Sequence, residues 1–178
     1  MASTSARSDD PGPAAVAFLV AQVGGLAASR FAERLQPLGM DPPQAGLLRA
    51  IAEAPGRSQQ ALSAQLGLLP SRLVTLVDEL ETEGLVERRR NPQDRRHHAL
   101  HVTAQGEQRL AALGRQARAH GESLLEPLSD RERATLGRLL RKVADHHELT
   151  PGVHPGYRWL GRGRADSDKS SAGQRQRR

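Results

Sequence analysis

The sequence predicts a mainly α-helical fold with one small β-hairpin. Apolar residues recur at the three- and four-residue spacing of helices in six segments, which are bounded by capping residues, proline or glycine. Residues 85–90 and 98–103 instead predict two short strands on either side of the turn-forming sequence NPQDRRH, and in the second Leu100 and Val102 alternate with polar neighbours. Aromatic residues make up only 2% of the 178 residues, so leucine, valine and alanine have to form the core.

The first two helices precede residue 55. One is expected from Ala14 to about Leu35, where Pro37 and Gly39 interrupt the pattern. The next is expected from Pro43 to Ala54, because Asp41 is a good N-cap and proline is favoured in a first helical turn.

The third and fourth helices are close together in sequence. Ser58 is the expected cap of a helix over 59–66, and Gly67 fits the left-handed position that ends a helix. The fourth helix is expected over 70–83. Its buried stripe is predicted to contain Leu69, Leu73, Leu76, Val77 and Leu80, and its opposite face Ser71, Arg72, Thr75 and Asp78.

Two further helices follow the hairpin, and both chain ends differ from the body in composition. Thr103 is expected to cap the long fifth helix, and Ser129 with Asp130 to begin the last one. Residues 1–12 are small, polar and proline-rich, which predicts a disordered N-terminal tail. Residues 151–178 contain seven basic and two acidic residues, so this basic C-terminal tail, also expected to be disordered, holds most of the net charge of +6.

The closely spaced helices 59–66 and 70–83 have the arrangement of a helix-turn-helix, in which the start of the second helix reaches base edges in a DNA major groove. Arg72 can bond guanine, and Ser71 and Thr75 can offer hydroxyl groups to bases. Ser58 and Gln59, at the start of a helix, can hold a phosphate. An ordinary helical hairpin with a solvated Arg72 would give the same pattern, so these two helices alone leave both interpretations open.

The arginines around the hairpin turn favour DNA. Five arginines lie within nine residues and are countered by Asp94 alone, so they would repel one another unless an anion such as a phosphate backbone were bound. Arginine at a hairpin tip can enter the minor groove, where the potential is negative. A solubilising charged surface is the alternative. We expect DNA contacts from Arg88, Arg90, Arg95 and Arg96, and expect Asp94 to fix the loop.

The stretch GLVERRRNPQDRRHHALHVTAQGE resembles the wing of the MarR family of winged helix-turn-helix regulators, with the family's D-x-R motif at Asp94 and Arg96. The preceding residues 41–86 resemble the DNA-binding helices of the same family, and the likeness spans roughly residues 14–147. It implies a homodimer on double-stranded DNA with a near-palindromic site. It also implies a dimerisation region over 13–38 and 104–147, a winged helix-turn-helix domain over 41–103, and repression of transcription.

The resemblance further implies that a small, often aromatic, anion tunes DNA affinity. Arg30 is the candidate partner of such an effector, although a surface or dimer-interface position would explain it equally well. The chain has no cysteine, so thiol oxidation is not its switch. The longest apolar run, 16–20, is far shorter than the roughly 20 residues of a membrane span. We therefore expect a cytoplasmic protein without a membrane partner.

Two other functions stay open as alternatives. The histidines at 97, 98, 101, 146 and 147 suggest a metal-responsive regulator, but the neighbouring arginines would repel a cation, and we expect no metal and no cofactor. The basic C-terminal tail suggests a non-specific DNA-binding protein. The sequence has no glycine-rich phosphate loop, no serine nucleophile motif and no paired carboxylates of a catalytic kind, so an enzyme is not expected.

Overall fold

The computed structural model describes residues 12–90 and 98–153. In these residues the chain forms helices α1 (Pro13–Leu35), η1 (Gln36–Leu38, a 3-10 turn), α2 (Pro42–Glu53), α3 (Gln59–Leu66) and α4 (Pro70–Thr82), strands β1 (Val86–Arg90) and β2 (His98–Val102), and helices α5 (Ala104–Leu124) and α6 (Asp130–His146). The predicted order of helices and hairpin is confirmed. Element bounds differ from the expected ones by at most one residue, and η1 was not expected.

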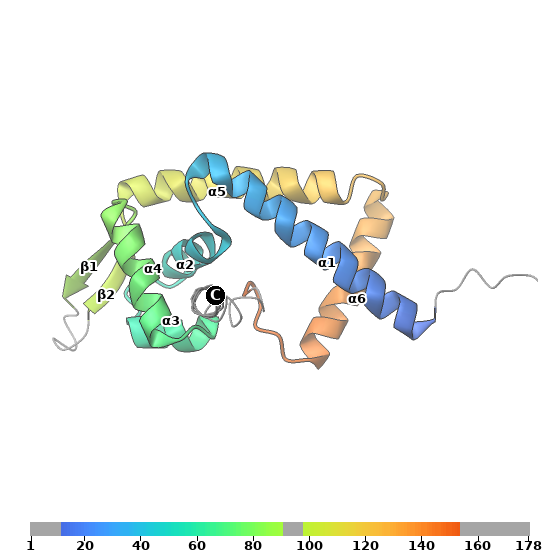
Figure 1. The fold of residues 1–178 in the computed structure, drawn as a ribbon, viewed down its shortest axis with the longest axis horizontal. Helices are drawn as coiled ribbons and strands as arrows, with labels where there is room; N and C mark the ends of the chain where they lie inside the picture. The colour runs from blue at the N-terminus through green and yellow to red at the C-terminus, as the bar shows by residue number, and fades with distance from the viewer. Residues whose placement is uncertain (1–11, 91–97, 154–178) are drawn as a thin grey trace, which may run out of the picture.

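Helix α5 is a long rod that connects the two ends of the molecule (Figure 1). Helices α2, α3 and α4 and the hairpin lie beneath its N-terminal end, and α6 descends from its C-terminal end. Helix α1 crosses between the two, and its C-terminal part packs on α5.

Local capping places α2 and α3 where the sequence predicts. The carboxylate of Asp41 accepts the Gln44 backbone N–H at 2.8 Å, while the Gln44 side chain accepts the Asp41 N–H at 2.9 Å, a reciprocal capping box. Ser58 Oγ accepts the Ala61 N–H at 3.3 Å. Each of these bonds satisfies an N–H group that the first turn of a helix leaves without an intrahelical partner.

The turn between α3 and α4 is held by backbone conformation and one buried hydroxyl. Gly67 has a φ of 64°, a left-handed conformation that glycine adopts without steric penalty. Ser63, which is buried, donates from Oγ to the Leu68 carbonyl at 2.7 Å. These two features fix the angle at which α4 leaves α3.

The hydrophobic core lies between α2, α3, α4, the hairpin and the start of α5. Leu47, Leu48, Leu62, Leu76 and Leu80 are among its fully buried side chains. The expected burial of Leu69 is wrong, because its side chain is 64% exposed. Leu69 is the N-cap of α4 and has extended backbone angles, so helical periodicity does not apply to it, and its neighbour Leu68 is buried instead.

The two strands are antiparallel, with Val86 opposite Val102 and Arg90 opposite His98. The segment before α3 adds a short third edge to this ribbon. Gly56 N–H donates to the Leu100 carbonyl at 3.0 Å, and Leu100 N–H donates to the Arg57 carbonyl at 3.3 Å. The N-terminus of α3 is therefore attached directly to the hairpin.

Helix α5 begins against the same hairpin. Thr103 caps it by accepting the Gly106 N–H at 3.0 Å and donates its own hydroxyl to the Gly84 carbonyl at 2.6 Å. Gly106 lies so close to the backbone that a Cβ atom there would be 2.1 Å from Leu85 O and 2.5 Å from Val102 Cγ1. Only glycine fits this contact of α5 with Leu85, the residue before β1, and with Val102 of β2.

Apolar side chains remain exposed on α1 and α6. They are Val16, Phe18, Leu19, Val20, Val23 and Leu26 on α1, and Leu139, Leu140 and Val143 on α6. By length and composition residues 13–38 could cross a membrane, with a mean hydropathy of 1.5 over the best window. The expectation from the short run 16–20 missed this, because alanine, glycine and scattered apolar residues extend the uncharged stretch to Arg30.

Gly106→Ala should destabilise the protein by about 2 kcal/mol or more, because the added methyl group overlaps the Leu85 carbonyl in a packed contact. Gly121→Ala in the same helix is the matched control, since a Cβ there meets nothing within 4 Å. It should be neutral or stabilising by up to about 1 kcal/mol. Urea unfolding of both variants measures the difference, and equal stabilities would contradict the close contact.

Candidate nucleic-acid interface

The solvent face of α4 is formed by small side chains. Ser71, Thr75 and Asp78 are exposed, as the sequence predicts, and they lie on the side of the helix opposite its buried leucines. Val74, which sequence reasoning did not select, is also exposed, at 42%. Thr75 Oγ1 donates to the Ser71 carbonyl at 3.1 Å, so these two residues form one local unit.

Arg72 lies at the flank of this face. Its side chain is 31% exposed, and its Nη1 is 3.9 Å from Glu79 Oε1, two turns further along the helix. The other oxygen of Glu79 accepts a hydrogen bond from Gln44 Nε2 of α2 at 3.1 Å. The candidate guanine-reading arginine is therefore paired with a carboxylate that also bonds α2.

The start of α3 lies beside the hairpin, as described above, with Ser58 and Gln59 half-buried. The Ser58 hydroxyl oxygen accepts the Ala61 N–H and so caps α3. The hydroxyl hydrogen is the group that would donate to a phosphate. The preceding Arg57 is exposed and donates to Gln65 Oε1 at 2.6 Å. Arg57 adds a cation to this helix start, and its position directly before the cap is the signal by which the sequence could have indicated it.

Arg88 joins the hairpin to α4. Its guanidinium donates to Glu81 Oε2 through Nη1 and to Asp78 Oδ1 through Nη2, and its backbone N–H donates to Glu81 Oε1 at 3.3 Å. The Arg88 side chain is only 23% exposed. Arg88 was expected to contact DNA, but here its donors are directed at two carboxylates of the neighbouring helix.

The other wing residues divide into two groups. Arg89 is exposed and pairs with Glu87 of its own strand. Arg90 ends β1, but its side chain lies outside the described residues, as do Asp94, Arg95 and Arg96. The structure thus brings Ser58, Gln59, Ser71, Thr75 and strand β1 to one side of the core.

Known proteins share this arrangement. The model of the MarR family matches residues 38–97. Over 113 residues the chain is 37% identical to a putative transcriptional regulatory protein for the hcr operon of Thauera aromatica, covering 64% of this chain and 68% of that protein. The chain belongs to the MarR family.

Solved structures of MarR proteins have the same fold. A MarR variant from Escherichia coli in complex with operator DNA is 27% identical, with a TM-score of 0.63, over 72% of this chain and 92% of that one. CouR from Rhodococcus jostii RHA1, bound to p-coumaroyl-CoA, is 31% identical, with a TM-score of 0.61, over 79% of this chain and 96% of that one. The fold is thus the winged helix of MarR proteins, and the class of function is DNA-binding regulation of transcription.

A second cluster of this MarR-family chain lies where α1 packs on α5. The rings of Phe31 and His120 are 5.4 Å apart between centroids, at an interplanar angle of 46°. Burial lowers the pKa of His120 below its usual 6.5, and the positive charges of Arg34 and Arg30 lower it further. Arg30, the candidate effector partner, therefore has a second arginine, a histidine and an aromatic ring beside it.

Within residues 12–90 and 98–153, no group of three or more histidine or acidic side chains is arranged to hold a metal ion. His146 and His147 stack edge to face at 5.0 Å between ring centroids at the end of α6. His101 lies in β2, whereas His97 and the His98 side chain lie outside the described residues.

Arg88→Ala should lower the free energy of unfolding by about 1–2 kcal/mol, because it leaves Asp78 and Glu81 without their shared cation. Arg89→Ala is the matched control, since Arg89 is exposed and pairs only within its strand among the contacts described. If Arg88 were instead a phosphate contact, its removal would leave stability unchanged and reduce the salt dependence of DNA binding by about 0.9 in log–log slope. Denaturant unfolding and a salt titration together distinguish the two roles.

Proposed function

We propose that this protein is a transcriptional repressor that binds a near-palindromic operator as a homodimer and loses affinity when a small anionic ligand binds. The exposed face of α4, braced by α3 and flanked by the hairpin, carries the DNA-binding part of this proposal. In this mode α4 enters the major groove and the loop between β1 and β2 reaches the adjacent minor groove. The structure of a MarR variant with operator DNA supports the assignment.

The uncovered faces of α1 and α6 support a dimer. Helix α6 has no buried residue, and Leu139, Leu140 and Val143 form an exposed apolar stripe on one side of it. Contiguous apolar surface of this kind marks a site of association. We therefore assign dimerisation to residues 13–38 and 104–147, and DNA binding to residues 41–103.

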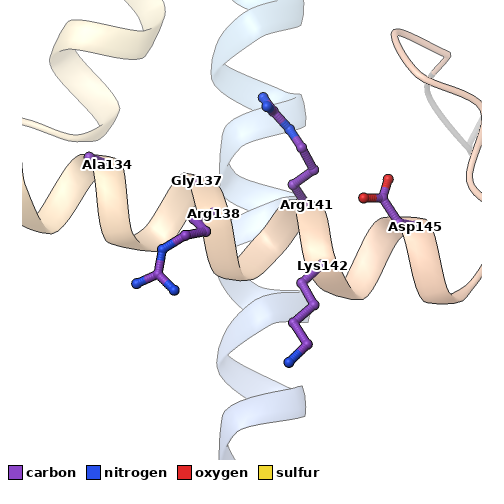
Figure 2. Close-up of a pocket in the computed structure, with 6 residues that line it drawn as sticks. All are labelled: Ala134, Gly137, Arg138, Arg141, Lys142 and Asp145. Carbon is purple, nitrogen blue, oxygen red and sulfur yellow. The ribbon is translucent and has the colours of Figure 1, made fainter.

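The other side of α6 is polar. A shallow hollow of about 610 Å³ is lined there by Ala134, Gly137, Arg138, Arg141, Lys142 and Asp145 (Figure 2). In Figure 2 the side chains of Arg141 and Lys142 point to opposite sides of the helix, so they do not converge on one point. Among the described residues only α6 lines this hollow, unlike the concave, largely apolar pockets that bind small molecules.

The cluster at α1 and α5 is a better effector site. Phe31 offers an aromatic ring, and Arg30 and Arg34 place two positive charges beside His120. An aromatic carboxylate matches both features. The CouR complex with p-coumaroyl-CoA favours an aromatic acid or its thioester as the class of ligand. A ligand that prefers one spacing of the two DNA-binding domains would change operator affinity by shifting the population toward that spacing.

The proposed function is tested by binding of the purified protein to DNA from its own upstream region, against scrambled duplex at physiological salt. Specific binding with two chains per duplex is expected. Arg96→Ala should weaken it by about tenfold or more, because a minor-groove arginine is lost. Arg131→Ala on α6 is the control that removes a charge elsewhere and should have little effect. Equal affinity for both duplexes would instead favour non-specific binding through the basic tail.

Ligand binding should strengthen as pH falls. In the free protein, the pKa of His120 is lowered by burial and by the positive charges of Arg34 and Arg30. A carboxylate bound beside His120 would raise that pKa. The complex therefore binds more protons, so affinity rises as pH falls below 6.5, by up to about tenfold. Calorimetric titration with benzoate at about pH 7.5 and about pH 5.5 measures this, because benzoate stays ionised at both.

His120→Gln should abolish this pH dependence, and His146→Gln on α6 should preserve it. An equal pH dependence in both variants would exclude the α1–α5 cluster as the ligand site.

A further inference from the structure

The chemistry that α4 presents to a major groove is set by which of its polar groups are already engaged. Arg72 is the sole basic residue in the sequence of α4, Pro70–Thr82. Guanine is read most often by a bidentate arginine or lysine. The state of Arg72 therefore decides whether this helix can read guanine.

Arg72 lies at the flank of the exposed face. It is paired with Glu79, which Gln44 of α2 holds by its second oxygen at 3.1 Å. Moving Arg72 to a base edge would leave the Glu79 carboxylate without its cation in the negative field of the DNA phosphates. The pair thus opposes guanine reading by this residue.

The acidic residue on the same face is engaged as well. Asp78 accepts from Arg88 of β1 through Oδ1, so its negative charge is paired with the Arg88 guanidinium. A carboxylate that reads cytosine has to accept from the cytosine amino group. We therefore assign Asp78 to the contact with Arg88 of β1 and not to base reading.

Ser71, Val74 and Thr75 remain on the exposed face. The Thr75 hydroxyl donates its hydrogen to the Ser71 carbonyl, which leaves its methyl group and its acceptor lone pairs for a ligand. Val74 is 42% exposed and lies outside the core cluster, so packing within the chain does not explain an apolar residue there. Together they present methyl groups beside hydroxyl groups.

We propose that α4 recognises thymine by its C5-methyl group, through Val74 and the methyl group of Thr75, so that the half-site beneath the start of the helix consists of A·T pairs. The thymine methyl group is the one apolar feature in the major-groove edges of the base pairs, and apolar side chains contact it directly. This inference rests on the proposed function, because it applies only if α4 enters the major groove. It assigns Arg72 to the positioning of Glu79 and Gln44 and not to base reading.

The test uses an operator enriched from random duplexes with the full-length protein. Each thymine of the half-site is then replaced by uracil, which removes only the C5-methyl group. At each contacted thymine the affinity should fall about fourfold, the ratio that corresponds to one buried methylene group. In Val74→Ala, the ratio of affinities for thymine and uracil should fall to about one at one position. The fold should stay intact, since Val74 is outside the core. Thr82→Ala, at the exposed C-terminal end of the same helix, is the matched control and should retain the preference.

Replacement of guanine by 7-deazaguanine, which removes the N7 acceptor, completes the design. Sensitivity to uracil that Val74→Ala removes supports the proposal. Specific binding that is insensitive to uracil, but weakened by 7-deazaguanine and by Arg72→Ala, would overturn the methyl readout while leaving the proposed function standing. Failure to enrich any sequence would overturn both.

Discussion

The contact between the start of α5 and the turn that joins α4 to β1 determines how the rest of the structure is connected. Gly106 lies against the Leu85 carbonyl, and Thr103 bonds both the first turn of α5 and the Gly84 carbonyl that follows α4. Arg109, one turn further along α5, donates to the Leu38 carbonyl and lies 4.0 Å from Glu83 Oε2. The long helix, the end of α4, the hairpin and the α1–α2 connection therefore meet within two turns of α5. Because Gly106 is in close backbone contact, we expect a rotation of α5 to move the end of α4 and the hairpin with it.

Charge neutralisation within the interface is a second constraint. Asp78, Glu79 and Glu81 lie on a helix that we propose to place against a polyanion, where free carboxylates would be repelled. Arg72 is paired with Glu79, and Arg88 with Asp78 and Glu81. These arginines favour DNA binding by removing repulsion and by holding the wing on α4. Arginines near a nucleic acid can thus increase binding affinity without contacting it.

Local rules predicted the elements of this protein better than they predicted side-chain roles. Caps at Asp41, Ser58 and Thr103 and the glycine turn at Gly67 depend on neighbours within a few residues, so the sequence indicated them correctly. The partners of Arg72 and Arg88 depend on how α4 packs on α2 and β1, which periodicity does not encode. Leu69 was misassigned because it is the N-cap that precedes α4, where helical periodicity does not apply. Val74 was overlooked because base-reading residues were chosen among polar side chains. The wing residues Asp94, Arg95 and Arg96 remain predictions from the sequence and its resemblance.

The exposed faces of α1 and α6 have a common explanation in the proposed dimer. By hydropathy alone residues 13–38 could span a membrane, but α6, whose apolar stripe is equally uncovered, contains five arginine or lysine residues and cannot. A second copy of the chain accounts for both helices, whereas a bilayer accounts for only one. The C-terminal part of α1 also buries Leu35 in the core and places Phe31 against His120 of α5. A ligand at that junction would lie between the proposed dimer surface and the DNA-binding domain, where in the proposed dimer a small shift of α1 against α5 would change the spacing of the two α4 helices.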